Sequence, residues 1–194
     1  MLKKHEIRSE LIKMRKNLNE IFITSSERLA LSRIRSVINH YERALGRKLN
    51  IMSYMSYKNE FSTVLTNELL RSLGHNLVFP YIDDDFVITA YNASSEKDMR
   101  ISPLGIKEPD PAICKAADPR DIDIVIMPGV AFDFHGNRIG FGKGCYDRFL
   151  AGTKPVLIAL AFDFQVFADI PADPFDIPCN YIITEVRTID CSAE

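Results

Sequence analysis

A glycine-rich segment at residues 136–148 combines cations with a carboxylate, as anion-binding loops do. It reads GNRIGFGKGCYDR. Glycine lets the backbone adopt positive φ and approach a ligand, so N–H groups can converge on phosphate oxygens, while Arg138 and Lys143 add charge-assisted hydrogen bonds. A helix expected to begin near Gly144 would add the positive end of its dipole. The composition indicates a phosphate cradle, with an ordinary glycine-rich turn as the alternative.

The two common nucleotide fingerprints do not fit this segment. A P-loop ending at Lys143 would need a glycine in place of Asn137 and a hydroxyl residue in place of Gly144. A dinucleotide loop beginning at Gly140 would need a glycine in place of Cys145. Any phosphate site here is therefore of another type.

The position of the segment in the chain supports a binding role. Residues 122–127 form a short, β-branched apolar run of the kind buried in parallel sheets, and Pro128 and Gly129 end it. The segment thus follows the carboxyl end of a strand. Ligands of open α/β sheets bind beyond those ends.

Residues 2–18 show the spacing of a helix. Apolar side chains recur at steps of four, three and four residues, at Ile7, Leu11, Met14 and Leu18. Three cations adjoin this stripe: Lys4, Arg8 and Arg15. Lys13 and Lys16 are expected to point away from it. The adjoining cations either bind a ligand or lay their stems along the core with their charges in water, and the spacing does not decide between the two.

Further elements alternate between helices and strands. A capping box at residues 24–27 is expected to open a second helix that runs to Leu45 and ends at Gly46. We expect strands at 49–55, 77–82, 86–91, 156–162 and 181–186, and a helix at 59–73. Asp83, Asp84 and Asp85 are read as a hairpin turn and not as a cation site, and 92–121 as a long surface connection. This order predicts one α/β domain over residues 1–194, with helices on both faces of the sheet.

The composition is that of a globular, cytoplasmic protein. Of the 194 residues, 46% are hydrophobic and 10% aromatic, enough for a sizeable core. The sequence shows neither an apolar run long enough to span a bilayer nor the pattern of a secretory signal. Four scattered cysteines are expected to be free thiols, because their spacing suggests neither a zinc site nor a disulfide framework.

Charge is distributed unevenly along the chain. Residues 1–48 carry 12 Lys and Arg against 5 Asp and Glu, although the net charge of the whole chain is −2. A basic segment raises the alternative of nucleic-acid binding, but a pI near 6.1 and the absence of a recognition motif argue against it. A small polyanionic ligand fits the pattern better.

Two motifs together resemble the signature of the 5-formyltetrahydrofolate cyclo-ligase family, also called methenyltetrahydrofolate synthetases. They are MPGVAFD at 127–133 and RIGFGKGCYDRFL at 138–150. Matching positions continue at Lys4 and Arg8, at 55–60, at GIKEP (105–109), at Gln165, and at Asp176 before 183–185. The resemblance therefore covers most of the chain.

This resemblance implies a three-layer αβα sandwich with a mostly parallel central sheet, similar to that of the CoA transferases. It also implies ATP- and Mg²⁺-dependent conversion of 5-formyltetrahydrofolate into 5,10-methenyltetrahydrofolate, with release of ADP and phosphate. The formyl oxygen is phosphorylated first, because a formamide oxygen is a poor leaving group. The expected partners are these two small molecules, with the folate in some cases polyglutamylated. We expect a monomer that binds neither nucleic acid nor membranes.

The resemblance also assigns roles to residues. Lys4 and Arg8 would grip the ATP phosphates, and Arg138, Lys143 and Tyr146 would act at the reacting phosphoryl group. The nucleotide would further contact the loop positions Gly140, Gly142, Gly144 and Cys145. Met55, Glu60 and Tyr146 would contact the folate, and Asp147 and Asp176 would hold Mg²⁺.

Some positions depart from the common family pattern, and some roles stay open. Cys145 replaces an aromatic residue, and Phe175 replaces a histidine that often precedes the metal-site aspartate. Asp133 and Asp163 are read as structural, because carboxylates commonly cap turns at strand ends. A nucleotide-binding protein without the folate pocket is the first alternative, which the presence of Glu60 disfavours. An RNA-associated role is the second, and no RNA-binding motif supports it.

Overall fold

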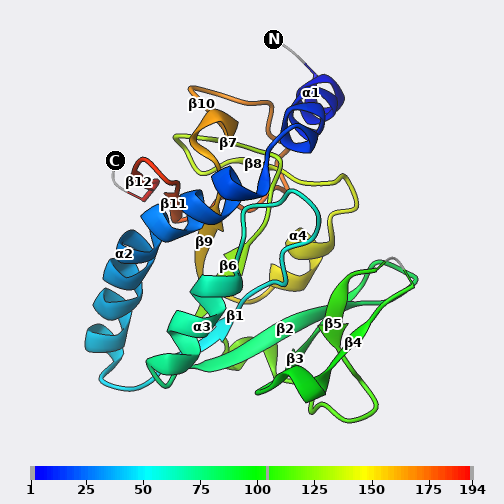
Figure 1. Ribbon diagram of the computed structural model, residues 1–194, viewed down its shortest axis with the longest axis vertical. Coiled ribbons are helices and arrows are strands. Elements are labelled where there is room, and N and C mark those ends of the chain that lie inside the picture. Colours follow the sequence, from blue (N-terminus) through cyan, green and yellow to red (C-terminus); the bar gives the residue numbers. More distant parts are fainter. Residues whose placement is uncertain (1–2, 104, 193–194) are drawn as a thin grey trace.

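The computed structural model describes residues 3–103 and 105–192, and a seven-stranded sheet crosses its centre (Figure 1). The strand order is β12-β11-β9-β6-β1-β2-β3. All neighbours from β11 to β2 pair in parallel, and the edge strands β12 and β3 are antiparallel. Their bounds are β1 Asn50–Met52, β2 Asn76–Ile82, β3 Ile88–Asn92, β6 Ile124–Met127, β9 Val156–Leu160, β11 Tyr181–Ile183 and β12 Thr188–Asp190.

Helices cover both faces of this sheet, so the expected three-layer αβα sandwich is confirmed. On one face, α2 (Glu20–Leu45) and α3 (Val64–Ser72) bury Ile34, Ile38 and Leu70 against apolar residues of the central strands. On the other, the short α4 (Cys145–Leu150) buries Tyr146 and Leu150. The inner strands face apolar layers on both sides, and therefore read as continuous β-branched runs.

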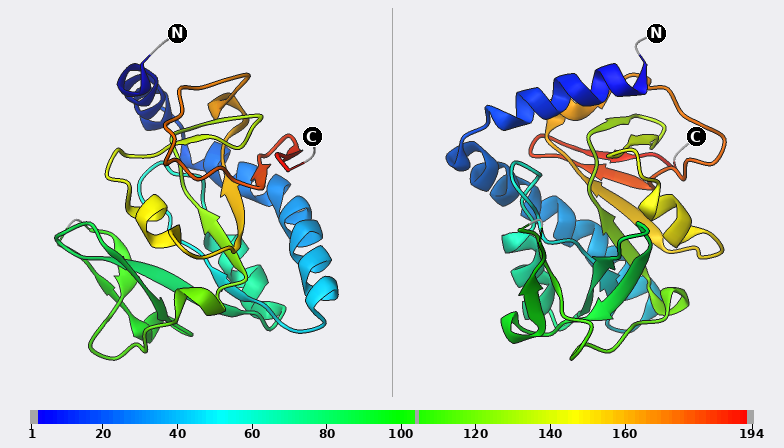
Figure 2. Two further views of the ribbon diagram at one scale, coloured as in Figure 1. Left: turned by 180° about the vertical axis from the view of Figure 1, so that it is seen from behind. Right: turned by 90° about the vertical axis from the view of Figure 1, so that its right-hand side faces the viewer.

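The first helix lies across the end of the sandwich (Figure 2). α1 (Lys4–Lys16) buries Ile7 and Leu11 against Val130, Ala131 and Ile139. These partners belong to, or border, a three-stranded sheet of β7 (Ala131–Asp133), β8 (Arg138–Ile139) and β10 (Val166–Phe167). Because β7 follows β6 after a short connection, α1 is held beside the carboxyl end of β6.

The segment 92–121, expected to be a plain connection, contains a second small sheet. β4 (Met99–Ile101) pairs antiparallel with β5 (Lys107–Pro109) and projects beside β2 (Figure 1). Three 3₁₀ turns complete the elements: η1 Glu96–Asp98, η2 Pro119–Asp121 and η3 Asp163–Gln165. Strands of three residues flanked by Pro and Gly carry little periodicity, so the sequence pattern missed this hairpin.

The capping box expected at residues 24–27 is wrong, because α2 begins earlier. Asn19 is the N-cap, and its side chain accepts from the Phe22 N–H at 2.8 Å. Glu27 is instead buried within α2 and accepts from both the N–H and the hydroxyl of Thr66, at 2.8 and 3.0 Å. A carboxylate read as a cap of its own helix thus caps the first turn of α3.

The helix expected at 59–73 begins only at Val64, and the preceding strand ends at Met52. Residues 53–63 form a loop beyond the carboxyl end of β1. The Tyr54 hydroxyl donates to the Phe61 carbonyl at 2.9 Å, and the Thr63 hydroxyl donates to the Tyr54 carbonyl at 2.6 Å. These bonds fold the loop back on itself.

Other expectations hold. Cys114, Cys145, Cys179 and Cys191 are free thiols. The Asp133 carboxylate is fully buried and accepts from the N–H groups of His135, Asn137 and Ile170, which is a structural role. Asp163 pairs with Arg187 and Thr184. Among the helices described, none is both long and apolar enough to cross a membrane.

Candidate active site

A large cavity opens beyond the carboxyl ends of the parallel strands. Its volume is about 1320 Å³, and α1, the 53–63 loop, the β2–β3 turn, the β4–β5 hairpin and the glycine-rich loop contribute to its wall. Every residue that the sequence assigned to a site lines it: Lys4, Arg8, Met55, Glu60, Arg138, Gly140, Gly142, Lys143, Gly144, Cys145, Tyr146, Asp147 and Asp176. The cavity therefore brings together residues that lie up to 172 positions apart.

The glycine-rich loop lies directly against Arg8. Arg8 Nε donates to the Gly140 carbonyl at 2.7 Å, so this side chain is held at the cavity wall. Gly142 has φ +90°, and a Cβ there would lie 3.4 Å from the Arg8 guanidinium carbon. Gly144 has φ +63° and caps α4, whose six residues make only a weak dipole. The open backbone and the adjacent cation suit an anionic ligand.

A second cation of α1 is bound by two aspartates. Lys4 Nζ lies 2.6 Å from Asp173 Oδ2 and 2.5 Å from Asp176 Oδ2. Partial burial alone would lower the pKa of Lys4, but its hydrogen bonds to both carboxylates raise it. Burial likewise works to raise the pKa of Asp176, and the bonds from Lys4 and the Asp173 N–H outweigh this and lower it. Both groups are therefore charged at neutral pH.

Arg138 occupies the middle of the site. Its Nη2 donates to Asp147 Oδ1 at 3.1 Å, and its guanidinium carbon lies 5.5 Å from the centre of the Tyr146 ring. The side chain is 8% exposed, and its Nε has no hydrogen-bond partner among the described residues. Arg138 thus lines the cavity with a largely buried, charged guanidinium whose hydrogen-bonding capacity is not fully used. Burial raises the pKa of Tyr146, so its phenol is a neutral donor.

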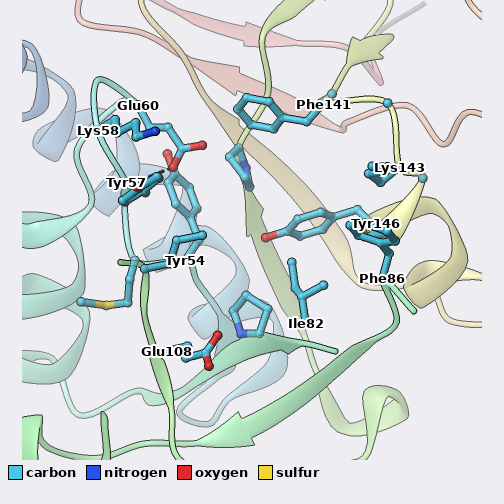
Figure 3. A pocket seen from close by; sticks show the side chains of 18 of the residues that line it. Tyr54, Tyr57, Lys58, Glu60, Ile82, Phe86, Glu108, Phe141, Lys143 and Tyr146 are labelled. Carbon is cyan, nitrogen blue, oxygen red and sulfur yellow. Dashed lines mark hydrogen bonds between the residues drawn. The ribbon is translucent and has the colours of Figure 1, made fainter. Parts of the chain in front are cut away.

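The opposite wall carries a buried carboxylate. Glu60 comes from the 53–63 loop and points toward the space in front of Tyr146 (Figure 3). Its side chain is 13% exposed, and its Oε2 accepts from the Tyr57 N–H at 3.0 Å. Burial raises the pKa of Glu60. Met55, from the same loop, adds an apolar contact surface, and its sulfur lies 3.8 Å from the Asn67 amide.

The sequence assigned no site role to several residues of the cavity wall. Asp173 binds Lys4, and Glu108 of β5 accepts from Arg100 at 3.1 Å with its carboxylate toward the cavity (Figure 3). Lys16, expected to point away, also lines the cavity. For Asp173, the signal available in the sequence was its position three residues before Asp176. Glu108 was named only as part of the GIKEP motif at 105–109, and its place at the cavity wall follows from the β4–β5 pairing.

The positions that depart from the family pattern have different surroundings. Cys145 is half-buried and packs beside the apolar layer that contains Tyr146. Phe175 is 88% exposed and does not line the cavity. A histidine at position 175 would therefore lie at the protein surface and not in the cavity wall.

The carboxylates suit a hard cation only with help from a ligand. No group of three or more metal-binding side chains is found within the described part of the chain. Asp147 and Asp176 both face the cavity, and Arg138 influences both of them. Mg²⁺ commonly uses one or two carboxylates together with substrate phosphates and water, so this pair fits Mg²⁺ that enters with a nucleotide.

Fold and site define an α/β protein with a cationic, glycine-rich cavity at its strand ends and a buried carboxylate across from it. The sequence profile of the 5-formyltetrahydrofolate cyclo-ligase family matches residues 1–185, and the chain belongs to this family. It is accordingly an enzyme of the ligase class, in folate one-carbon metabolism.

Individual relatives agree with this assignment. A 5-formyltetrahydrofolate cyclo-ligase of Haemophilus influenzae is 28% identical over 181 residues, which cover 91% of this chain and 94% of the relative. The Escherichia coli K12 enzyme of the same name is 30% identical over 68% of this chain and 75% of its own. The solved 5,10-methenyltetrahydrofolate synthetase of Aquifex aeolicus superposes with a TM-score of 0.77 at 30% identity, covering 98% of this chain and 94% of that one. A synthetase from Mycoplasma pneumoniae shares the fold, with a TM-score of 0.73 at 23% identity over 95% and 99% of the chains.

Proposed function

We propose that this enzyme uses ATP and Mg²⁺ to cyclise 5-formyltetrahydrofolate to 5,10-methenyltetrahydrofolate, releasing ADP and phosphate. One observation carries the proposal: the cationic glycine-rich loop and the buried Glu60 line the same cavity, which at about 1320 Å³ is large enough for two ligands. A phosphate donor and a folate held there would have their reacting ends in contact.

The reaction needs activation of an amide oxygen and not a protein nucleophile. The formyl oxygen attacks the γ-phosphorus of ATP, and the bond to the ADP oxygen breaks. The second folate nitrogen then attacks the formyl carbon, loses its proton to solvent, and phosphate leaves with the former formyl oxygen. Since the protein forms no covalent bond, its contribution is positioning and charge neutralisation.

Cations and backbone hold the phosphates in this proposal. Lys4 and Arg8 approach from α1, and Arg138 and Lys143 approach from the loop. Arg138, whose guanidinium binds Asp147 in the structure, would donate charge-assisted hydrogen bonds to a phosphoryl oxygen. The nucleotide also contacts Gly140, Gly142, Gly144 and Cys145, where small side chains keep the backbone accessible.

Asp147 and Asp176 would hold Mg²⁺, which when bound neutralises phosphate charge. In the structure both carboxylates are neutralised by protein cations, Asp147 by Arg138 and Asp176 by Lys4. Arrival of the metal nucleotide would exchange these partners. Lys4 and Arg138 would then be available to the phosphates, and Asp147 and Asp176 would hold the metal.

Glu60 and Tyr146 would recognise the folate. A carboxylate accepts hydrogen bonds from the N–H donors of the folate ring, and Met55 packs against the ring face. Because burial keeps the Tyr146 phenol protonated, it donates a hydrogen bond and does not act as a base.

The cavity draws residues from Lys4 to Asp176, which supports residues 1–194 acting as one domain. All of these residues come from a single chain, so we propose a monomer as the working unit. The cytoplasmic location expected from the sequence stays a prediction.

The test is direct. Protein, 5-formyltetrahydrofolate and Mg·ATP are mixed, and the near-ultraviolet absorbance of the conjugated methenyl product is followed. We expect absorbance to rise only when all components are present. A flat trace at high enzyme concentration would overturn the proposal.

A further inference from the structure

Arg15 is the buried cation of α1, and the proposed reaction supplies no role for it. It lies about two helical turns beyond Arg8, and its side chain is 7% exposed. Burial lowers the pKa of Arg15, yet a guanidinium stays charged in proteins. The charged guanidinium is therefore not solvated, and a buried cation needs hydrogen-bond acceptors or a counter-charge within the protein.

Its partners come from three separate segments. Arg15 Nε donates to the Asn59 carbonyl at 2.8 Å, and Nη1 donates to the Gly129 carbonyl at 3.4 Å. The guanidinium carbon also lies 5.9 Å from the centre of the Phe141 ring in the glycine-rich loop. One side chain thus connects the 53–63 loop, the end of β6 and the glycine-rich loop.

The relation of Arg15 to Glu60 is electrostatic. Arg15 Nη2 lies 4.0 Å from Glu60 Oε1, beyond hydrogen-bonding distance, while Glu60 Oε2 accepts from the Tyr57 N–H. A charge at this range stabilises the carboxylate without closing it off from a ligand. The bond to Asn59, the residue next to Glu60, fixes the backbone from which the carboxylate extends.

From this geometry we infer that Arg15 is a positioning residue for folate recognition, which fixes the 53–63 loop and holds Glu60 aimed into the cavity. This inference rests on the proposed function, because it assigns Glu60 to the folate. Arg15 itself does not touch the reacting atoms. Its loss should weaken folate binding more than ATP binding, because it donates a hydrogen bond to the 53–63 loop and meets the glycine-rich loop only at the Phe141 ring.

The chain offers a matched control in Arg33. This arginine of α2 also donates to carbonyls of another segment, at 3.2 Å to Glu185 and 2.8 Å to Val186, and does not line the cavity. Arg33→Gln therefore removes a comparable set of bonds away from the site. Arg15→Lys keeps the charge and loses the planar fork.

The experiment compares wild type, Arg15→Gln, Arg15→Lys and Arg33→Gln by KM for each substrate, kcat, and calorimetric titration with 5-formyltetrahydrofolate in the absence of ATP. We expect Arg15→Gln to raise the folate KM and Kd by about tenfold, with the ATP KM changed less than about twofold, as for loss of one charge-assisted contact. Arg15→Lys should recover part of this loss. Arg33→Gln should leave both KM values unchanged.

The outcomes separate the inference from the proposed function. An active wild type whose folate KM is unchanged in Arg15→Gln, or whose two KM values rise together, overturns the inference alone. If Arg15→Gln fails to fold, an Arg15→Lys variant with wild-type folate affinity overturns it as well. A wild type that neither turns over nor binds 5-formyltetrahydrofolate overturns both.

Discussion

The guanidinium of Arg138 donates to the carboxylate of Asp147 at 3.1 Å across the mouth of the glycine-rich loop. Both side chains are proposed to change partners when the metal nucleotide binds. Substitutions at Arg138 or Asp147 should therefore affect the nucleotide-binding part of the site.

Asp147→Asn should raise the Mg²⁺ concentration needed for half-maximal activity. We expect a shift of at least about tenfold, the cost seen even for residues that only orient a metal ligand. The 5-formyltetrahydrofolate Kd should stay within about twofold, because Asp147 lies on the phosphate side. Asp118→Asn removes an exposed carboxylate paired with Arg120 and serves as the control. Unchanged metal dependence would remove Asp147 from the metal site.

Arg8→Ala should act mainly on ATP. Arg8 is held by the Gly140 carbonyl beside the loop, so its loss should raise the ATP KM by about tenfold or more, as for removal of a charge-assisted hydrogen bond. Steady-state kinetics with each substrate varied measures this. Lys13→Ala, an exposed cation of the same helix, should leave the kinetics unchanged. Wild-type ATP kinetics in Arg8→Ala would assign Arg8 to packing alone.

The sequence carries local signals for the residues of this half of the cavity. Lys4, Arg8 and the glycine-rich loop carry signals in residue type and spacing, and the strand before the loop places it at a sheet edge. The same pattern named Arg15 but left its role open, since an arginine beside an apolar stripe has the same spacing whether it is solvated or buried. Only the carbonyls of Asn59 and Gly129 decide between these states, and they come from distant segments.

Tertiary contacts also explain the errors on the folate side. The helical pattern at 59–73 gives way to a loop because Glu27 of α2 caps α3 at Thr66, and Arg15 binds the carbonyl of Asn59. Met55 and Glu60 both line the cavity, although the local structure expected around them was incorrect. Neither bond leaves a local trace in the sequence.

Gly142→Ala should weaken ATP binding through the backbone. Its φ of +90° is unfavourable for a side chain, and the new Cβ would lie 3.4 Å from the Arg8 guanidinium carbon. We expect a loss of roughly 1 kcal/mol of stability and a several-fold rise in the ATP KM. Gly152→Ala has a similar φ of +81° with nothing within 4 Å of the new Cβ. It should lose stability in thermal unfolding with an unchanged ATP KM, and equal KM effects in both variants would contradict the assignment.

The pH profile of kcat/KM for the folate should have an acid limb, where activity falls because Glu60 becomes protonated. Burial raises the pKa of Glu60 above its ordinary value of 4.5, against the Tyr57 N–H and Arg15, which lower it. A raised pKa means that the carboxylate takes up its proton at a higher pH, so kcat/KM for the folate should fall as pH drops while still above 4.5. In Arg15→Gln, which loses a lowering influence, the limb should move to higher pH. A limb that does not move would indicate that another group causes it.

The proposed reaction requires the formyl oxygen to attack the γ-phosphate of ATP within this cavity. The most direct measurement uses 5-formyltetrahydrofolate labelled with ¹⁸O in the formyl group and determines the mass of the phosphate released. The account predicts one labelled oxygen in each phosphate formed. Unlabelled phosphate, released at the same rate as the methenyl product, would contradict it.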